Sequence, residues 1–144
     1  MSEYQSSRAL VRLEAYGRWA AKQGQQQSKI REIGYALASA GFCTLDDQAE
    51  VLGIGRSTTW TIVKAAHKSS GLSARVIERI LESPRLPPEV RTRVFEYARE
   101  KALGAYGHSA AQRRRFCVRL CVATSACVLE SCVEQDRRGP AINE

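Results

Sequence analysis

The residues best suited to chemistry are hydrogen-bond donors gathered between residues 56 and 68. If residues 56–66 form a helix, one face of it carries Arg56, Ser57, Thr58, Trp60, Thr61 and Lys64. Guanidinium, hydroxyl, indole and ammonium groups all donate hydrogen bonds to acceptors on bases and phosphates. Between Glu50 and Glu78 the sequence has no acidic residue, whereas Arg56, Lys64, Lys68 and Arg75 fall there. The stretch predicts a surface that binds nucleic acid.

Composition agrees with an anionic partner. The formal net charge is +7 over 144 residues, and clustered lysines and arginines gain free energy by displacing counterions from a phosphate backbone. The length suits one domain, and segments rich in Ala, Leu, Arg, Glu and Lys at helical spacing predict an all-α fold. Residues 1–7 are polar and lack the apolar core of a secretory signal, so we expect a cytoplasmic protein.

No set of residues indicates catalysis, a metal or another cofactor. The sequence offers no Ser-His-Asp set, metal-carboxylate cluster or phosphate-binding loop, so we do not expect an enzyme. His67 and His108 lack a partner at ligand spacing, which favours a surface or capping role. The cysteines are odd in number and contain no C-x-x-C, so we interpret them as thiols: Cys43, Cys117, Cys121, Cys127 and Cys132.

Residues 45–63 predict two helices that cross through a tight turn. Thr44 followed by Asp47 forms an acidic variant of a capping box, which starts the first helix at Leu45. Gly53 can adopt the left-handed backbone of a turn, and Ala49 is small enough for a close crossing. Side chains predicted to close the core between the two helices are Leu52, Ile54 and Ile62.

The flanking segments predict further helices. Residues 5–22 predict an amphipathic helix with Leu10, Leu13, Tyr16, Gly17 and Ala20 on one face; Gly24 and the following glutamines predict a break, after which Ser28 caps a second helix that ends at Gly41. Two more are expected from Ser73 to Glu82 and from Pro88 to Gly104. Residues 116–133 could be a helix, a strand or a poorly ordered extension, and residues 134–144 a disordered tail.

These elements divide the chain into three predicted parts. An N-terminal helical extension covers residues 1–43, a DNA-binding domain covers 44–104, and a basic, cysteine-containing and partly disordered extension covers 105–144.

One stretch resembles the helix-turn-helix of the lactose-repressor family and, more distantly, of small phage repressors. The resemblance runs from Thr44 to about Glu82, and it is carried by Thr44-Leu45, Ala49-Glu50, Gly53-Ile54, Thr58 and Leu72-Ser73-Ala74-Arg75. It implies that the second helix enters the major groove, where Arg56, Ser57 and Thr61 read bases. The residues then expected to contact the DNA backbone are Thr44, Thr58, Trp60, Lys64 and Lys68. Gln48, Thr59 and Gly55 depart from the family pattern.

The sequence therefore predicts a sequence-specific transcriptional regulator, and more particularly a repressor. We expect a homodimer on double-stranded DNA, over half-sites about one helical turn apart, with the first helix or residues 116–133 as its interface. Alternatives are an adaptor in phage-like packaging or recombination, and a helical module that does not bind DNA. No small-molecule effector can be inferred.

Three residue roles also stay open. Trp60 could instead lie in the core or in a dimer interface, and residues 113–115 could bind phosphate or form a solvated face. We expect four cysteines to be dispensable for DNA binding: Cys117, Cys121, Cys127 and Cys132. Truncation after Arg115 should therefore preserve the preference for particular bases.

Overall fold

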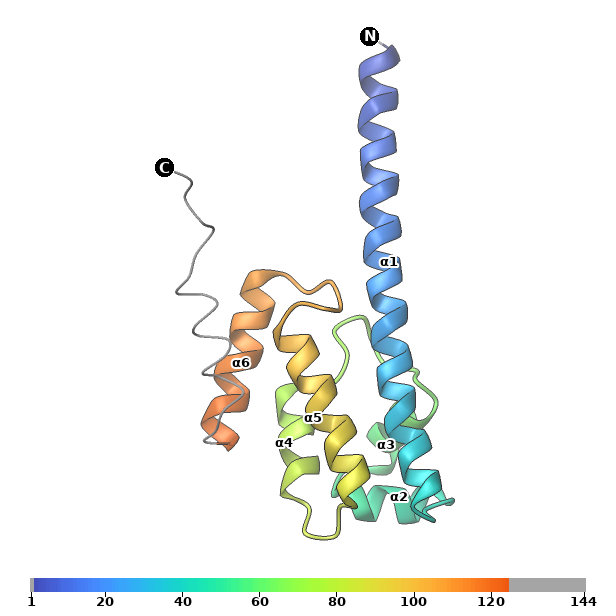
Figure 1. The fold of residues 1–144 in the computed structure, drawn as a ribbon, viewed down its shortest axis with the longest axis vertical. Coiled ribbons are helices and arrows are strands. Elements are labelled where there is room, and N and C mark those ends of the chain that lie inside the picture. The colour runs from blue at the N-terminus through green and yellow to red at the C-terminus, as the bar shows by residue number, and fades with distance from the viewer. Residues whose placement is uncertain (1, 125–144) are drawn as a thin grey trace.

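The computed structural model describes the backbone of residues 2–124 and the side chains of residues 3–120, and within them all regular structure is α-helical (Figure 1). The helices are α1 (Ser2–Ser39), α2 (Leu45–Leu52), α3 (Arg56–Val63), α4 (Ala74–Glu82), α5 (Pro88–Ala102) and α6 (Ala110–Thr124). The predicted all-α class is confirmed. Among these helices, we find none with both the length and the apolar character of a membrane span.

The predicted break at Gly24 is wrong, because α1 is one continuous helix through this region. Two of the glutamines that suggested a loop, and Gln23 before them, anchor the helix instead. Gln23 donates to the carbonyl oxygen of Tyr106 at 2.9 Å, Gln26 to that of Ser69 at 3.0 Å, and Gln27 to that of Ala65 at 3.2 Å. A helical glycine costs only about 1 kcal/mol, which such contacts can offset. The helix ends as expected before Gly41, whose φ is +98°.

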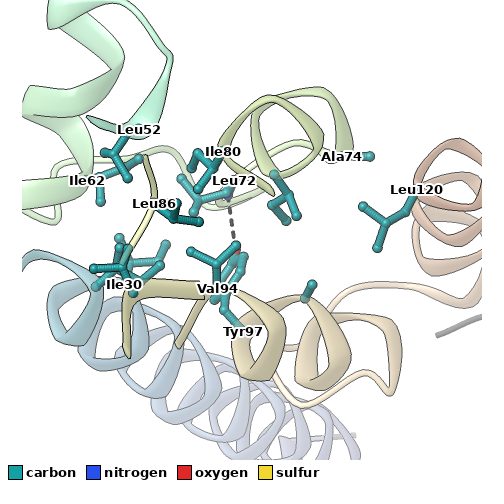
Figure 2. Close-up of a cluster of buried hydrophobic side chains, with 14 of the residues drawn as sticks. Ile30, Leu52, Ile62, Leu72, Ala74, Ile80, Leu86, Val94, Tyr97 and Leu120 are labelled. Atoms are coloured by element: carbon teal, nitrogen blue, oxygen red, sulfur yellow. Dashed lines mark hydrogen bonds between the residues drawn. The ribbon is translucent and has the colours of Figure 1, made fainter. Parts of the chain in front are cut away.

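One hydrophobic core draws on all six helices. Ile33 and Leu37 of α1 and Ile62 of α3 are fully buried in it. Figure 2 shows Leu52, Ile80, Val94 and Tyr97 converging from α2, α4 and α5, with Leu120 of α6 at one side. The N-terminal half of α1 lies outside this core and extends well beyond the other helices (Figure 1).

A buried polar network joins α1, α5 and the segment before α4. The Tyr97 hydroxyl accepts from the backbone N–H of Leu72 at 3.0 Å (Figure 2). It also donates to the side-chain oxygen of Gln26 at 2.8 Å. Gly71 is needed beside it: a Cβ there would lie 2.2 Å from the Tyr97 hydroxyl oxygen, and its φ is +70°. The network fixes the α3–α4 connection against the bundle.

Residues 116–124, whose structure the sequence left open, continue α6. Phe116, Cys117 and Leu120 are buried in the core, and the ammonium of Lys101 lies 4.6 Å from the centre of the Phe116 ring. Truncation after Arg115 would therefore remove core side chains, contrary to the idea that everything beyond it is an appendage. The predicted roles of Cys127 and Cys132 and the predicted tail fall outside the described residues, as does the side chain of Cys121.

Candidate nucleic-acid interface

Helices α2 and α3 are joined by a three-residue turn, residues 53–55. The Thr44 hydroxyl accepts from the backbone N–H of Asp47 at 3.2 Å, so α2 begins where the sequence predicted. Gly53 ends α2 with φ +70° and donates its N–H to the carbonyl oxygens of Ala49 and Glu50. Gly55 precedes α3 without a side-chain cap. Local sequence thus sets both ends of the turn.

The inner face of α3 is held by α2 and by the C-terminal half of α1. Thr59 and Ile62 of α3 are fully buried. Gly34 allows α1 to approach closely, because a Cβ at that position would lie 3.3 Å from the Cα of Val63. Buried Thr59 donates its hydroxyl to the carbonyl oxygen of Gly55 at 2.9 Å. One face of α3 is therefore fixed, and the opposite face must point outward.

Gln48, the other polar departure from the family pattern, is also accommodated. It is buried on α2, and its amide donates to the carbonyl oxygen of Phe42 at 2.8 Å. The Ser83 hydroxyl similarly donates to the carbonyl oxygen of Val51 at 2.6 Å, which ties the end of α4 to α2. Ala49, predicted at a helix crossing, is buried with 7% exposure. Buried Gln48 and Thr59 both donate hydrogen bonds to carbonyl oxygens, so they do not loosen the packing.

The outward face of α3 carries exposed Ser57 and Trp60. Exposed Lys64 follows as the C-cap, because the helix ends at Val63 and not at Ala66 as predicted; Ala65 has a left-handed φ of 51°. Trp60 is the largest of these side chains, and it is 48% exposed, which excludes a place in the core of this chain. Thr61 lies at the edge of the face, half-buried, with its hydroxyl donating to the carbonyl oxygen of Thr58 at 2.7 Å. Ser57 and Trp60 are thus better presented to a partner than Thr61.

Arg56, at the first turn of α3, is paired with Asp46 at the start of α2. Its Nε lies 3.0 Å from a carboxylate oxygen of Asp46, and both side chains are about two-thirds exposed (67% and 71%). An exposed pair of this kind contributes little to stability. It can nevertheless orient the guanidinium, leaving its other N–H donors available to a base or a phosphate.

The other residues predicted to contact the DNA backbone lie on several elements. Thr58 is half-buried on α3, Thr44 is exposed at the start of α2, and Lys68 is exposed in the α3–α4 connection. Lys64 and Lys68 make no ion pair with any carboxylate in the described part of the chain. Their ammonium groups are consequently available to an anion.

The Arg113–Arg115 triplet divides between two environments on α6. Arg113 packs against Gly104, with its Cδ 3.1 Å from where a Cβ would stand. Arg114 and Arg115 border a groove of about 730 Å³ between α6 and the start of α4, away from α1 (Figure 1). The triplet is therefore neither a uniform solvated face nor one cluster of charges.

Lys101, which sequence reasoning missed, lies at the base of this groove. Its ammonium donates to the carbonyl oxygens of Ser70 at 2.6 Å and Leu72 at 2.7 Å. Burial lowers the pKa of Lys101 to about 8. The signal that could have found it is its position on the apolar face of α5, four residues after Tyr97.

The two histidines border the same region. His108 contacts the carbonyl oxygen of Ser70 through Nε2 at 3.2 Å, in keeping with a capping role. Burial and the positive charge of Lys101 lower the pKa of both His67 and His108, so both rings are neutral near pH 7.

Comparison with models of protein families, with curated proteins and with solved structures finds no match to this chain. The resemblance to lactose-repressor helix-turn-helix sequences accordingly stays a prediction, and the function must be argued from the geometry above.

Proposed function

We propose that this protein is a sequence-specific DNA-binding regulator, most simply a repressor, whose α3 enters the major groove. The observation that carries the proposal is the division of α3 into two faces. Thr59 and Ile62 anchor it to the bundle, while Arg56, Ser57 and Trp60 are exposed on a helix held by α1 and α2. A rigidly held helix with exposed donors is what direct reading of base edges requires.

Electrostatics support the same surface. Lys64 and Lys68 follow the donors along the chain without carboxylate partners among the described residues. Phosphate contacts of this type position a protein on DNA, and base contacts then provide the sequence preference. In this proposal Arg56, Ser57 and Thr61 read bases; Thr44, Thr58, Trp60, Lys64 and Lys68 contact the backbone.

The proposal is tested by the salt dependence of DNA binding. The plot of log K against log salt has a negative slope. Removing two phosphate contacts with Lys64→Gln and Lys68→Gln should make this slope less steep by about 2. The matched control is Arg99→Gln, because Arg99 is an exposed arginine on α5, away from α3. Equal slopes for the double variant and the control would place the phosphates elsewhere, and absence of binding at low salt would reject the proposal.

A helical module that binds protein is the second candidate, and exposed Trp60 favours it, since aromatic residues are enriched at protein interfaces. An adaptor that binds both DNA and a larger enzyme is a variant of this candidate. Selection of DNA by the isolated chain distinguishes them, because a regulator selects a site alone and an adaptor does so only beside its partner.

A further inference from the structure

The N-terminal half of α1 forms an arm, defined here as residues 3–22, that exposes apolar side chains. Every residue of the arm is exposed, including Leu10 (61%), Leu13 (66%) and Tyr16 (65%). Figure 1 shows it extending beyond the other helices. An isolated helix of about 20 residues that contains a glycine is only marginally stable in water. Burial of the arm against a partner would both stabilise the helix and remove this apolar surface from water.

Small and apolar residues of the arm, together with Gly24 just beyond it, form one stripe. Leu10, Leu13, Gly17, Ala20 and Gly24 follow one another three and four residues apart, the spacing of a seam between two paired helices. At 3.6 residues per turn, this stripe points away from the face on which Ile30, Ile33 and Leu37 are buried. A Cβ added at Gly17 or Gly24 would meet nothing within 4 Å. The stripe is therefore uncharged and open along its whole length.

We propose that the arm pairs antiparallel with the arm of a second copy of this chain, centred on Gly17. The stripe is self-complementary in this arrangement, as a two-fold interface requires. Leu10 of one copy lies against Gly24 of the other, and Leu13 lies against Ala20. Each leucine thus meets a small residue, and glycine meets glycine at the centre, so no level sets leucine against leucine. Parallel pairing would instead set leucine on leucine at one end and glycine on glycine at the other.

The surroundings of the stripe fit the same partner. A groove of about 570 Å³ borders Gly24, with Ala21, Ser28 and Tyr106 in its wall, and Leu10 of the other copy would lie at its mouth. Glu14 and Arg18 share one flank of the stripe. Antiparallel pairing brings Glu14 of each copy beside Arg18 of the other. Two opposite-charge contacts therefore flank the apolar seam.

The size of the arm fits a small, concentration-dependent dimer. The arm has about 20 residues per copy, of which only the stripe and its flanks can contact the partner, whereas standard interfaces use roughly 20–30 residues a side. Tyr16, which is 65% exposed, adds aromatic area at the edge of the stripe.

This inference is independent of DNA binding, because it rests on the arm and not on α3. It does constrain the proposed regulator. Gly34, where α1 meets α3, lies 17 residues beyond Gly17. The two Gly34 positions are then roughly 50 Å apart along the paired helices. The two half-sites would be separated by more than the single turn of DNA, about 34 Å, that the sequence suggested.

Sedimentation velocity of the full chain without DNA tests the pairing. At about 10 µM the unmodified chain should sediment as a dimer, and the double variant Leu10→Glu, Leu13→Glu should raise the dissociation constant more than about 100-fold. Val11→Glu is the matched control, because Val11 is equally exposed (60%) but lies off the stripe, and this variant should stay dimeric. A monomeric unmodified chain, or equal losses in the variant and the control, would overturn the proposal.

Two further variants test the close approach and the direction of the helices. Gly17→Leu removes a helix-weakening residue, so it should not lower the helicity of the full chain in circular dichroism, but it should abolish a dimer that needs contact at Gly17. Glu14→Arg should weaken the dimer about fivefold by creating like-charge contacts, and adding Arg18→Glu should restore it. If Gly17→Leu leaves the dimer unaffected, the two helices do not meet along the proposed stripe. Failure of the second exchange to restore affinity would overturn the antiparallel arrangement.

Discussion

The two halves of α1 belong to one helix, yet they meet opposite environments. In the C-terminal half, Ile30, Ile33 and Leu37 are fully buried against the bundle, whereas Leu10 and Leu13 in the N-terminal half are exposed. Both halves show apolar residues at helical spacing, so periodicity alone does not distinguish them. The difference is that the other helices pack against the C-terminal half of α1 and do not cover its N-terminal half. A periodic apolar face therefore predicts a helix, but not whether its partner belongs to the same molecule.

The largest expected effect comes from placing one charge in each half. Ile33→Asp buries a carboxylate in the core and should lower the free energy of unfolding by at least about 4 kcal/mol. Leu13→Asp should change it by less than about 0.5 kcal/mol, if measured at a concentration too low for arms to pair. Urea unfolding of both variants provides the comparison. Similar losses in the two would mean that the arm packs on its own bundle.

An intermediate effect is expected from filling one glycine in each half. Gly34→Leu forces side-chain atoms against the backbone of Val63, which should cost about 1–3 kcal/mol and lower the melting temperature. Gly17→Leu meets open space, so at a concentration too low for arms to pair the bundle should melt at an unchanged temperature. If Gly34→Leu is tolerated equally well, α1 does not hold α3 as described, and the fixed orientation of the outward face loses its basis.

A pH-dependent effect is expected from buried Lys101, because burial changes the pKa of its ammonium group. Its pKa is lowered from 10.5 to about 8 by burial, so between about pH 8 and pH 10 the unfolded chain binds more protons than the folded chain. Stability should therefore rise with pH across this window. Above pH 10 the trend reverses, because burial raises the pKa of Tyr97 and Tyr106. Lys101→Met should abolish the rise in urea midpoints, and a rise that persists in the variant would assign it to another group.

Local signals in the sequence predicted much of the fold. Thr44, Gly53 and Ser73 each have a side chain or backbone geometry that specifies a helix end, and each helix begins or ends there. The break at Gly24 was wrong because Gln23, Gln26 and Gln27 find carbonyl partners far along the chain, which no local pattern reveals. Burial of Phe116, Cys117 and Leu120 depends on α4 and α5 in the same way.

The candidate site was predicted less evenly than the fold. Helical spacing identified the exposed face of α3, since Thr59 and Ile62 had to point inward. It could not anticipate that Arg56 pairs with Asp46 or that Thr61 turns its hydroxyl toward the Thr58 carbonyl oxygen. Both interactions depend on the side-chain conformations in the folded protein, which helical spacing does not specify.

Selection of bound sequences from a random DNA pool, followed by affinities on single-base variants of the selected site, tests the central claim most directly. If α3 reads DNA, the chain should select a defined site. Arg56→Ala should then weaken binding to that site by about 1–3 kcal/mol and relax the preference at one base position. A uniform loss across all variants would make Arg56 a phosphate contact. If no sequence is selected, or if Arg56→Ala leaves both affinity and preference unchanged, α3 does not read DNA and the proposed function is wrong.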